Sequence, residues 1–207
     1  MHSFSIGDAL QFGWHKTRDH SGLLFQVVLA LFALQVASAI VQKVLEDTLL
    51  GIGVSLVLAI MGVIVGAGFM VIVLKLAQGH AAHYRDLVPP ATLVWYFFCA
   101  TVVSGFLILL GFIALIIPGI YLALRFSMVR FAILDLPAQA GGAGITESLH
   151  RSGRLTRGHK WHLLWFFLTL AGMNIIGLLL LYVGLLVTVP VSGLAWAHVY
   201  LKLKNKA

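Results

Sequence analysis

The feature that most constrains the fold is one long apolar run from Trp95 to Asp135. A bilayer hydrocarbon core of about 30 Å needs about 20 helical residues, so this run is too long for a single membrane crossing. It predicts two membrane helices, one over residues 93–110 and one ending near residue 134. The turn between them is expected between Gly111 and Gly119.

The remainder of the chain has the same character. Its 207 residues are 60% apolar and only 10% charged, and the mean hydropathy is +1.00, whereas soluble domains are about 25% charged. Four further apolar segments bring the total to about six spans: residues 23–42, 49–76, 161–181 and 184–203. We therefore predict an all-α, multi-pass membrane protein in which three helical hairpins form one integral membrane domain over residues 1–207.

Two amphipathic segments, residues 5–21 and 145–159, precede apolar spans. In the first, apolar and charged side chains separate onto different sides of a helix, with Trp14 on the apolar side. Such segments are typical of helices that lie in the membrane interface. We expect both to be interfacial helices on the cytoplasmic side. A cleaved signal peptide is disfavoured because the segment before the first apolar run is long and carries Asp8 and Asp19. A signal peptide begins instead with a short, positively charged region.

The chain also contains an internal similarity. Residues 6–20 align without gaps on residues 145–159, and the distance from Gly105 to Pro118 equals that from Gly177 to Pro190. This pattern indicates repeated units of an interfacial segment followed by a helical hairpin. The repeats are expected over residues 5–78 and 144–204, with a degenerate middle unit over residues 87–135.

The positive charges favour one topology. With six spans, the first, third and fifth connections hold only Lys43 of the 14 lysines and arginines, and the termini and the second and fourth connections hold or adjoin the other 13. Because cytoplasmic loops collect Lys and Arg, both termini are expected in the cytoplasm. The net charge of +7 therefore indicates topology, and we expect no nucleic-acid partner.

Small residues and helix breakers suggest where helices pack and turn. A stripe on one face of the second span predicts close helix packing, within the chain or in a homo-oligomer; it comprises Ser55, Ala59, Gly62 and Gly66. Turns or kinks are expected at Gly111, Pro118, Gly119, Gly184 and Pro190.

Catalytic chemistry is poorly represented. No Asp or Glu lies in the apolar interior of any predicted span, and two pairs of histidines at i, i+3 spacing supply too few ligands for a metal site. We predict a protein that is not an enzyme, with no catalytic residues, cofactor or metal. The polar residues Gln35, Asn174 and His198 are expected to form interhelical hydrogen bonds. The alternative is that they line a substrate path.

The basic face remains as the candidate site. Its residues are expected to bind anionic lipid headgroups or a membrane-protein partner, although topology alone accounts for the same charges. They are Arg125, Arg130, Arg151, Arg154, Arg157, Lys160 and Trp161. The resulting hypothesis is a protein of membrane or envelope maintenance that acts as a scaffold or lipid-binding partner. The alternative is a small transporter or channel for a hydrophobic or lipidic solute.

The chain resembles a group of poorly characterised bacterial membrane families. The similarity spans nearly the whole chain and is carried by two motifs, GFIALIIPGI with the following Ala-Leu-Arg125, and a Glu147-to-Trp161 segment containing Ser152 and Gly158. The group includes the YciC-like integral membrane proteins and the membrane domain attached to some glycerophosphoryl diester phosphodiesterases. This resemblance implies a polytopic helical protein of the bacterial cytoplasmic (inner) membrane. It implies no activity, because the phosphodiesterase chemistry belongs to a separate soluble domain.

Overall fold

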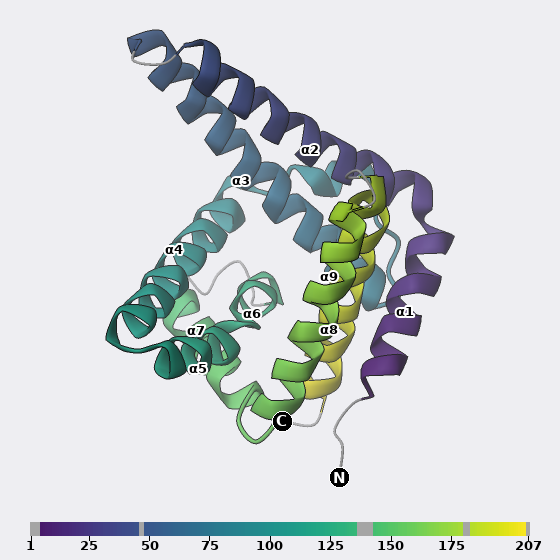
Figure 1. Ribbon diagram of the computed structural model, residues 1–207. Coiled ribbons are helices and arrows are strands. Elements are labelled where there is room, and N and C mark those ends of the chain that lie inside the picture. Colours follow the sequence, from purple (N-terminus) through teal and green to yellow (C-terminus); the bar gives the residue numbers. More distant parts are fainter. Residues whose placement is uncertain (1–4, 46–47, 136–142, 180–182, 206–207) are drawn as a thin grey trace.

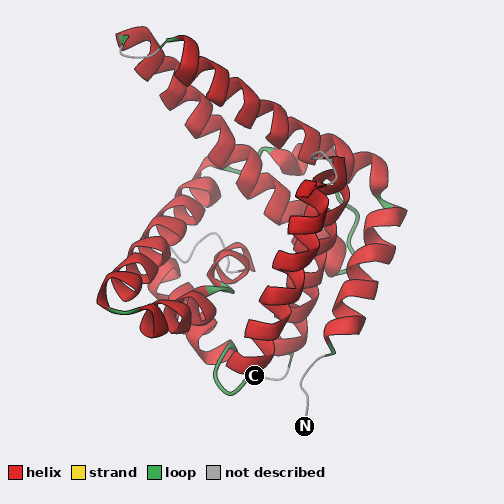
Figure 2. Cartoon of the chain, viewed as in Figure 1, coloured by secondary structure: helices red, strands yellow, loops and turns green. Residues whose placement is uncertain are grey.

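The computed structural model describes residues 5–45, 48–135, 143–179 and 183–205. Every regular element in these ranges is a helix (Figure 2), which confirms the all-α prediction. In chain order the helices are α1 (Ile6–Asp19), α2 (Ser21–Val44), α3 (Leu49–Ala77), the 3-10 helix η1 (Tyr84–Leu87), α4 (Ala91–Ala114), α5 (Ile116–Phe126), α6 (Val129–Asp135), α7 (Ala143–Leu155), α8 (Lys160–Leu179) and α9 (Val183–Lys204).

Six helical segments of the described chain are long and apolar enough to cross a membrane. Five of them are α2, α3, α4, α8 and most of α9, and the sixth combines α5 with α6. The predicted spans agree with these segments to within a few residues at each end. The end of the predicted fifth span, at Leu181, lies outside the described residues. The length and apolar composition of these helices therefore indicate a multi-pass membrane protein.

Glycines allow close contact between the helices of two hairpins. A methyl carbon built on Gly119 of α5 would lie 2.5 Å from the ring of Phe112 on α4, and one built on Gly184 of α9 would lie 2.6 Å from Cα of Gly177 on α8. Both separations are shorter than a van der Waals contact, so any side chain there would force the helices apart. The α4–α5 turn itself is at Leu115, whose backbone is extended, inside the predicted interval.

The two prolines predicted to mark turns or kinks differ in their effect on helix hydrogen bonding. Pro118 lies in the first turn of α5, where a backbone N–H has no partner within the helix and its loss costs nothing. Pro190 lies inside α9, where it removes one backbone hydrogen bond of the helix. Pro118 is therefore part of a turn, and only Pro190 interrupts the hydrogen bonding of a spanning helix.

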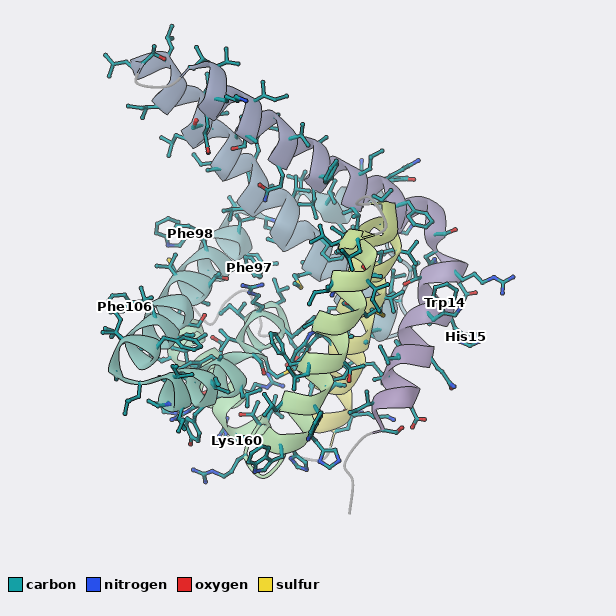
Figure 3. All side chains as sticks on the ribbon, viewed as in Figure 1. Trp14, His15, Phe97, Phe98, Phe106 and Lys160 are labelled. Atoms are coloured by element: carbon teal, nitrogen blue, oxygen red, sulfur yellow. The ribbon has the colours of Figure 1, made fainter. Side chains whose placement is uncertain are left out.

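The first amphipathic segment forms α1, which packs along α9. Its buried face consists of the small residues Ala9, Gly13 and Thr17, at a spacing of four. A methyl carbon on Gly13 would lie 2.5 Å from the carbonyl oxygen of Val191, so the two helices are in close contact. Trp14 points away from this contact and is 53% exposed (Figure 3). Its location at the membrane interface stays a prediction.

The buried core lies between α3, α8 and α9, where Ile72, Phe166 and Tyr200 are fully buried. The α2–α3 hairpin projects from this core at its closed end (Figure 1), and its side chains there are among the most exposed apolar ones, led by Leu49 at 89%. Apolar helical surface of this kind is suited to lipid because the helix satisfies its own backbone hydrogen bonds.

One predicted helix is interrupted. The span expected to end near residue 134 is divided into α5 and α6 by Ser127 and Met128. The predicted small-residue linker over residues 137–144 lies almost entirely outside the described residues. The internal repeats and the cytoplasmic location of the termini stay predictions.

Candidate functional site

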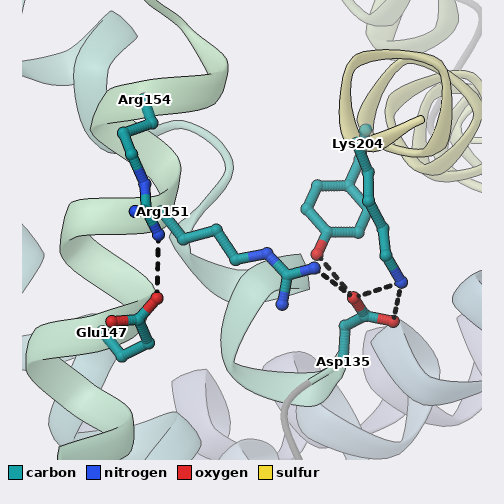
Figure 4. Close-up of polar contacts among 6 residues, drawn as sticks. Asp135, Glu147, Arg151, Arg154 and Lys204 are labelled. Atoms are coloured by element: carbon teal, nitrogen blue, oxygen red, sulfur yellow. Dashed lines mark hydrogen bonds and ion pairs between the residues drawn. The ribbon is translucent and has the colours of Figure 1, made fainter. Parts of the chain in front are cut away.

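The most heavily paired polar group is the carboxylate of Asp135, at the end of α6 (Figure 4). Its oxygens accept hydrogen bonds from Tyr200 Oη at 2.9 Å and Lys204 Nζ at 2.7 and 3.0 Å, and Arg151 Nη2 lies 3.1 Å away. The Asp135 side chain is only 8% exposed. Arg151, expected to bind lipid or a partner, is therefore held in an internal ion cluster.

A second arginine of the predicted face is also neutralised. Arg154 Nη2 lies 2.9 Å from Glu147 Oε1, two turns earlier on α7 (Figure 4). Both side chains are more than half exposed, so the pair is weak and easily exchanged. Arg154 thus has a local counter-ion in the structure.

Arg125 lies where α5 ends, and its backbone is fixed by α7. The hydroxyl of Ser152 donates to the carbonyl oxygen of Arg125 at 2.7 Å and accepts the N–H of Met128 at 3.2 Å. Ser152 is fully buried, so one side chain satisfies backbone groups on both sides of the interruption between α5 and α6. The side chain of Arg125 lies against Gly153, where a methyl carbon would approach Nε to 3.1 Å.

Tyr121 on α5 contacts a cation from α8. Lys160 Nζ lies 3.4 Å from the centre of the Tyr121 ring, which is a cation–π contact. Arg125 follows Tyr121 by one turn of α5, and Arg157 lies in the turn that leads to Lys160. Among the described residues no carboxylate forms an ion pair with any of these three cations. We call Tyr121, Arg125, Arg157, Lys160 and the neighbouring Trp161 the basic patch.

The chain reaches this patch through a tight turn between α7 and α8. Gly158 has φ +82°, in the left-handed region that glycine adopts without strain. Lys160 begins α8 at the end of the molecule where α1 begins and α9 ends (Figure 3). Trp161 follows it and is 75% exposed. Aromatic side chains beside cations are typical of the membrane–water interface.

Arg130 lies apart from the basic patch and lines two hollows. The larger, of about 680 Å³, lies between α4, α5, α6, α8 and α9, and the smaller, of about 260 Å³, lies between α3, α4 and α6. Met70 and Thr101 also line both. No carboxylate of the described residues pairs with Arg130.

A separate polar contact joins α3 to the loop that follows it. Lys75 Nζ lies 2.6 Å from Asp86 Oδ1, and the N–H of His83 donates to Asp86 Oδ2 at 2.9 Å. Partial burial of Asp86 opposes its ionisation, but these two donors outweigh it and hold the pKa of Asp86 below its usual value of 3.8. This contact orders the polar connection before α4.

The two glycines of the predicted packing stripe have no close partner in the described chain. Methyl carbons built on Gly62 or Gly66 would meet nothing within 4 Å, and both glycines line the smaller hollow. Ala59 is exposed and Ser55 is half-buried. Close packing of this stripe, within the chain or against a second molecule, stays a prediction.

The three polar residues in the spans do not share a site. Asn174 Nδ2 donates to Ser192 Oγ at 3.0 Å, the His198 ring stacks on Phe12 at 4.2 Å, and Gln35 is exposed on α2. None of them lines either hollow. The transporter alternative required them to lie together, and the structure separates them. Among the described residues no group of three or more His, Cys, Asp or Glu is placed to hold a metal ion.

Sequence reasoning missed the residues that organise the site. Asp135 and Tyr200 gave no pattern, because their contacts join segments 65 residues apart. Ser152 did give a signal, since Ser148, Ser152 and Thr156 recur every four residues on an otherwise basic helix. All three are fully buried, so these hydroxyl residues mark the face of α7, and of the turn after it, that packs against the rest of the molecule.

Comparisons with known proteins place the chain in an uncharacterised group, as the sequence predicts. A family model described as "Protein of unknown function (DUF975)" matches residues 99–207, more than half of the chain. No curated protein and no solved structure matches the chain. These comparisons give no evidence for a link to the YciC-like or phosphodiesterase-associated families. The matched region contains the basic patch, the Asp135 cluster and most of the lining of the larger hollow.

Proposed function

Since the chain belongs to the DUF975 family, whose function is unknown, we propose that it is a non-enzymatic membrane protein that binds anionic lipid headgroups at the basic patch. In this proposal the chain acts in the maintenance of a bacterial inner membrane, with both termini in the cytoplasm. The bacterial location derives from the sequence resemblance, and the orientation derives from the distribution of Lys and Arg.

The observation that carries the proposal is the unequal pairing of the basic residues. Arg151 and Arg154 have carboxylate partners, whereas Arg125, Arg157 and Lys160 have none among the described residues. Like charges held close together raise the local positive potential and favour an anion between them. A phosphate group accepts hydrogen bonds from guanidinium groups in a bidentate geometry, so two arginines and a lysine suit it well.

The surroundings of the patch favour a lipid over a soluble anion. Trp161 and Trp165 are 75% and 62% exposed at the start of α8, and Tyr121 is also exposed. Such aromatic rings lie at the level of lipid headgroups. Each cation near an anionic leaflet contributes on the order of 1 kcal/mol, so three together give a specific but reversible attachment.

The absence of catalytic activity is part of the proposal. Asp135 is the most buried carboxylate in the ion pairs of the described chain, and all of its close partners are structural donors. The patch itself contains cations and aromatic rings and no group suited to act as a general base near neutral pH.

The experiment compares retained lipids in two doubly substituted proteins. Arg157→Glu with Lys160→Glu reverses two patch charges, while Lys43→Glu with Arg85→Glu reverses two exposed charges elsewhere and changes the net charge equally. Native mass spectrometry after extraction from membranes containing phosphatidylglycerol and phosphatidylcholine counts the bound lipids. We expect at least a threefold loss of retained phosphatidylglycerol in the patch variant and no loss in the control. Equal retention in the two variants would refute lipid binding at the patch.

A further inference from the structure

The larger hollow has a polar end and an apolar end. Arg130, Thr101 and Ser127 line one part of it, whereas Ile108, Phe112 and Ile120 line the part nearest the α4–α5 turn. From Thr101 to Phe112, α4 runs along the hollow for about 16 Å at 1.5 Å per residue. A space with this division of polarity is complementary to an amphiphile, with its head near Arg130 and its chain along α4.

The charge at the polar end comes from Arg130, an exposed residue that lines the hollow. Arg130 is the only charged residue among the described ones that line the hollow, and its surroundings there are otherwise largely Phe, Leu, Ile and Trp side chains. A cation in apolar surroundings within a membrane segment is costly unless it is paired. No carboxylate of the described chain supplies that partner. An anion bound in the hollow would supply the counter-ion that the described residues do not.

A second polar group points to the same place. The hydroxyl oxygen of Thr101 is shielded from solvent and has no hydrogen-bond partner among the described residues. Buried hydroxyl groups nearly always have a partner, so an unsatisfied one that lines a hollow is available to a bound group or to a water molecule. Thr101 and Arg130 line both hollows, so this unused hydroxyl and the unpaired cation face the same spaces.

We propose that the larger hollow holds one anionic membrane lipid. Its anionic headgroup oxygens contact Arg130 and Thr101, and an acyl chain lies between α4, α5 and α8 against Phe112, Leu164 and Phe167. The volume of about 680 Å³ lies within the range of about 300–1,000 Å³ that is usual for ligand pockets. Because the acyl chain is apolar along its length, it matches the apolar lining of α4 and α8.

This site is separate from the basic patch. Ile120 and Leu124 of α5 line the hollow, whereas Tyr121 and Arg125 of the same helix belong to the patch. The proposal deepens the lipid-binding function but does not depend on it. Substitutions at one site leave the other intact, so failure of either proposal is observed independently.

The test uses the full chain and two substitutions that act differently. Arg130→Gln removes the charge but keeps a polar side chain, and Gly105→Phe fills the hollow, where a methyl carbon on Gly105 would meet nothing within 4 Å. The matched controls are Arg85→Gln, an exposed arginine, and Gly172→Phe, a glycine on α8 with equally open surroundings. The probe is phosphatidylglycerol with brominated acyl chains, added to the detergent-purified protein.

Tryptophan quenching locates the bound lipid. Trp196 lines the hollow, so bromine atoms on a chain bound there quench its fluorescence. The difference between the wild-type protein and Trp196→Phe isolates that contribution. We expect saturable quenching of Trp196, at least a tenfold weaker half-saturation for Arg130→Gln, and loss of the saturable quenching in Gly105→Phe but not in Gly172→Phe.

Two results would overturn the proposal. One is quenching of Trp196 that is unchanged in both Arg130→Gln and Gly105→Phe, because the lipid would then lie elsewhere. The other is equal affinity for brominated phosphatidylcholine and phosphatidylglycerol in the wild-type protein. Such equality would mean that Arg130 does not select an anion and that the hollow takes up any acyl chain.

Discussion

The ammonium group of Lys204 lies 2.7 Å from the carboxylate of Asp135, although the two residues are 69 positions apart in the chain. This contact joins the end of α9 to the end of α6, and Arg151 adds α7 to the same carboxylate. One buried acid thus holds three helix segments together. It also keeps Arg151 in an internal ion pair.

Replacing Asp135 by Asn is expected to destabilise the protein. The substitution keeps the shape of the side chain but leaves Arg151 and Lys204 without their counter-ion. We expect a loss of about 2 kcal/mol, less than the roughly 3–5 kcal/mol for a fully buried pair, because both cations are partly exposed. The free energy of unfolding in mixed micelles measures this loss.

The control is Glu147→Gln, which breaks an exposed ion pair with Arg154. Exposed pairs contribute roughly 0–1 kcal/mol, so this variant should remain close to the wild type. A loss at Glu147 as large as that at Asp135 would contradict the distinction between a structural and an exposed pair.

Ser152→Ala is expected to weaken the interruption between α5 and α6. The variant loses the hydroxyl that bonds the Arg125 carbonyl and the Met128 N–H, and no water reaches this buried position easily. Unsatisfied buried groups cost about 1–3 kcal/mol. Thermal unfolding followed by circular dichroism in detergent measures the change.

Ser148→Ala provides the comparison, since Ser148 is equally buried but its hydroxyl bonds, within the described chain, the Ile145 carbonyl of its own helix. Alanine is the better helix former, so this variant should lie within about 0.5 kcal/mol of the wild type. If Ser148→Ala and Ser152→Ala lost equal stability, the bridge across the interruption would have no special importance.

The Lys75–Asp86 contact predicts a dependence of stability on pH. The folded-state pKa of Asp86 lies below 3.8, so its contribution is complete above about pH 4 and disappears as the pH falls through the folded-state pKa. Unfolding temperatures of the wild type and Asp86→Asn are compared from pH 5 to pH 2.5. The difference between them should shrink as the pH falls through this window. A constant difference would show that ionised Asp86 adds no stability.

Gly184→Ala should open the α8–α9 hairpin. The added methyl would lie 2.6 Å from Gly177 Cα, and overpacking of this kind costs about 1–3 kcal/mol. Gly172→Ala on α8 meets nothing within 4 Å and should be neutral or stabilising by about 0.5–1 kcal/mol. The unfolding free energies of the two variants are compared in the same detergent. Equal effects would contradict the close approach of the hairpin.

Hydropathy and turn residues predicted the helices of this chain well. The length of the apolar runs indicates how many helices cross a bilayer, and glycines and prolines interrupt these runs. The spans and the turn before Pro118 were therefore predictable. The interruption after Phe126 was not, because residues 124–129 contain no glycine or proline. It depends on a hydroxyl from Ser152, which is distant in sequence.

The candidate site was predicted only as a set of basic residues. Their division into paired and unpaired groups depends on where Asp135 and Glu147 lie in three dimensions, and sequence spacing revealed neither contact. Arg151 and Arg154 lie on the same helix, but Arg151 pairs with a buried carboxylate and Arg154 with an exposed one. The hollows around Arg130 depend on six helices together and have no signature in the sequence.

The most direct test of the account compares Arg154→Gln with Arg157→Gln. The two arginines are three residues apart and both exposed, but only Arg154 has a carboxylate partner among the described residues. The measurement is the number of phosphatidylglycerol molecules retained per protein, by native mass spectrometry at fixed salt. The account predicts a clear decrease for Arg157→Gln, about threefold, and no change for Arg154→Gln. Equal retention in the two variants, or a larger loss for Arg154→Gln, would contradict it.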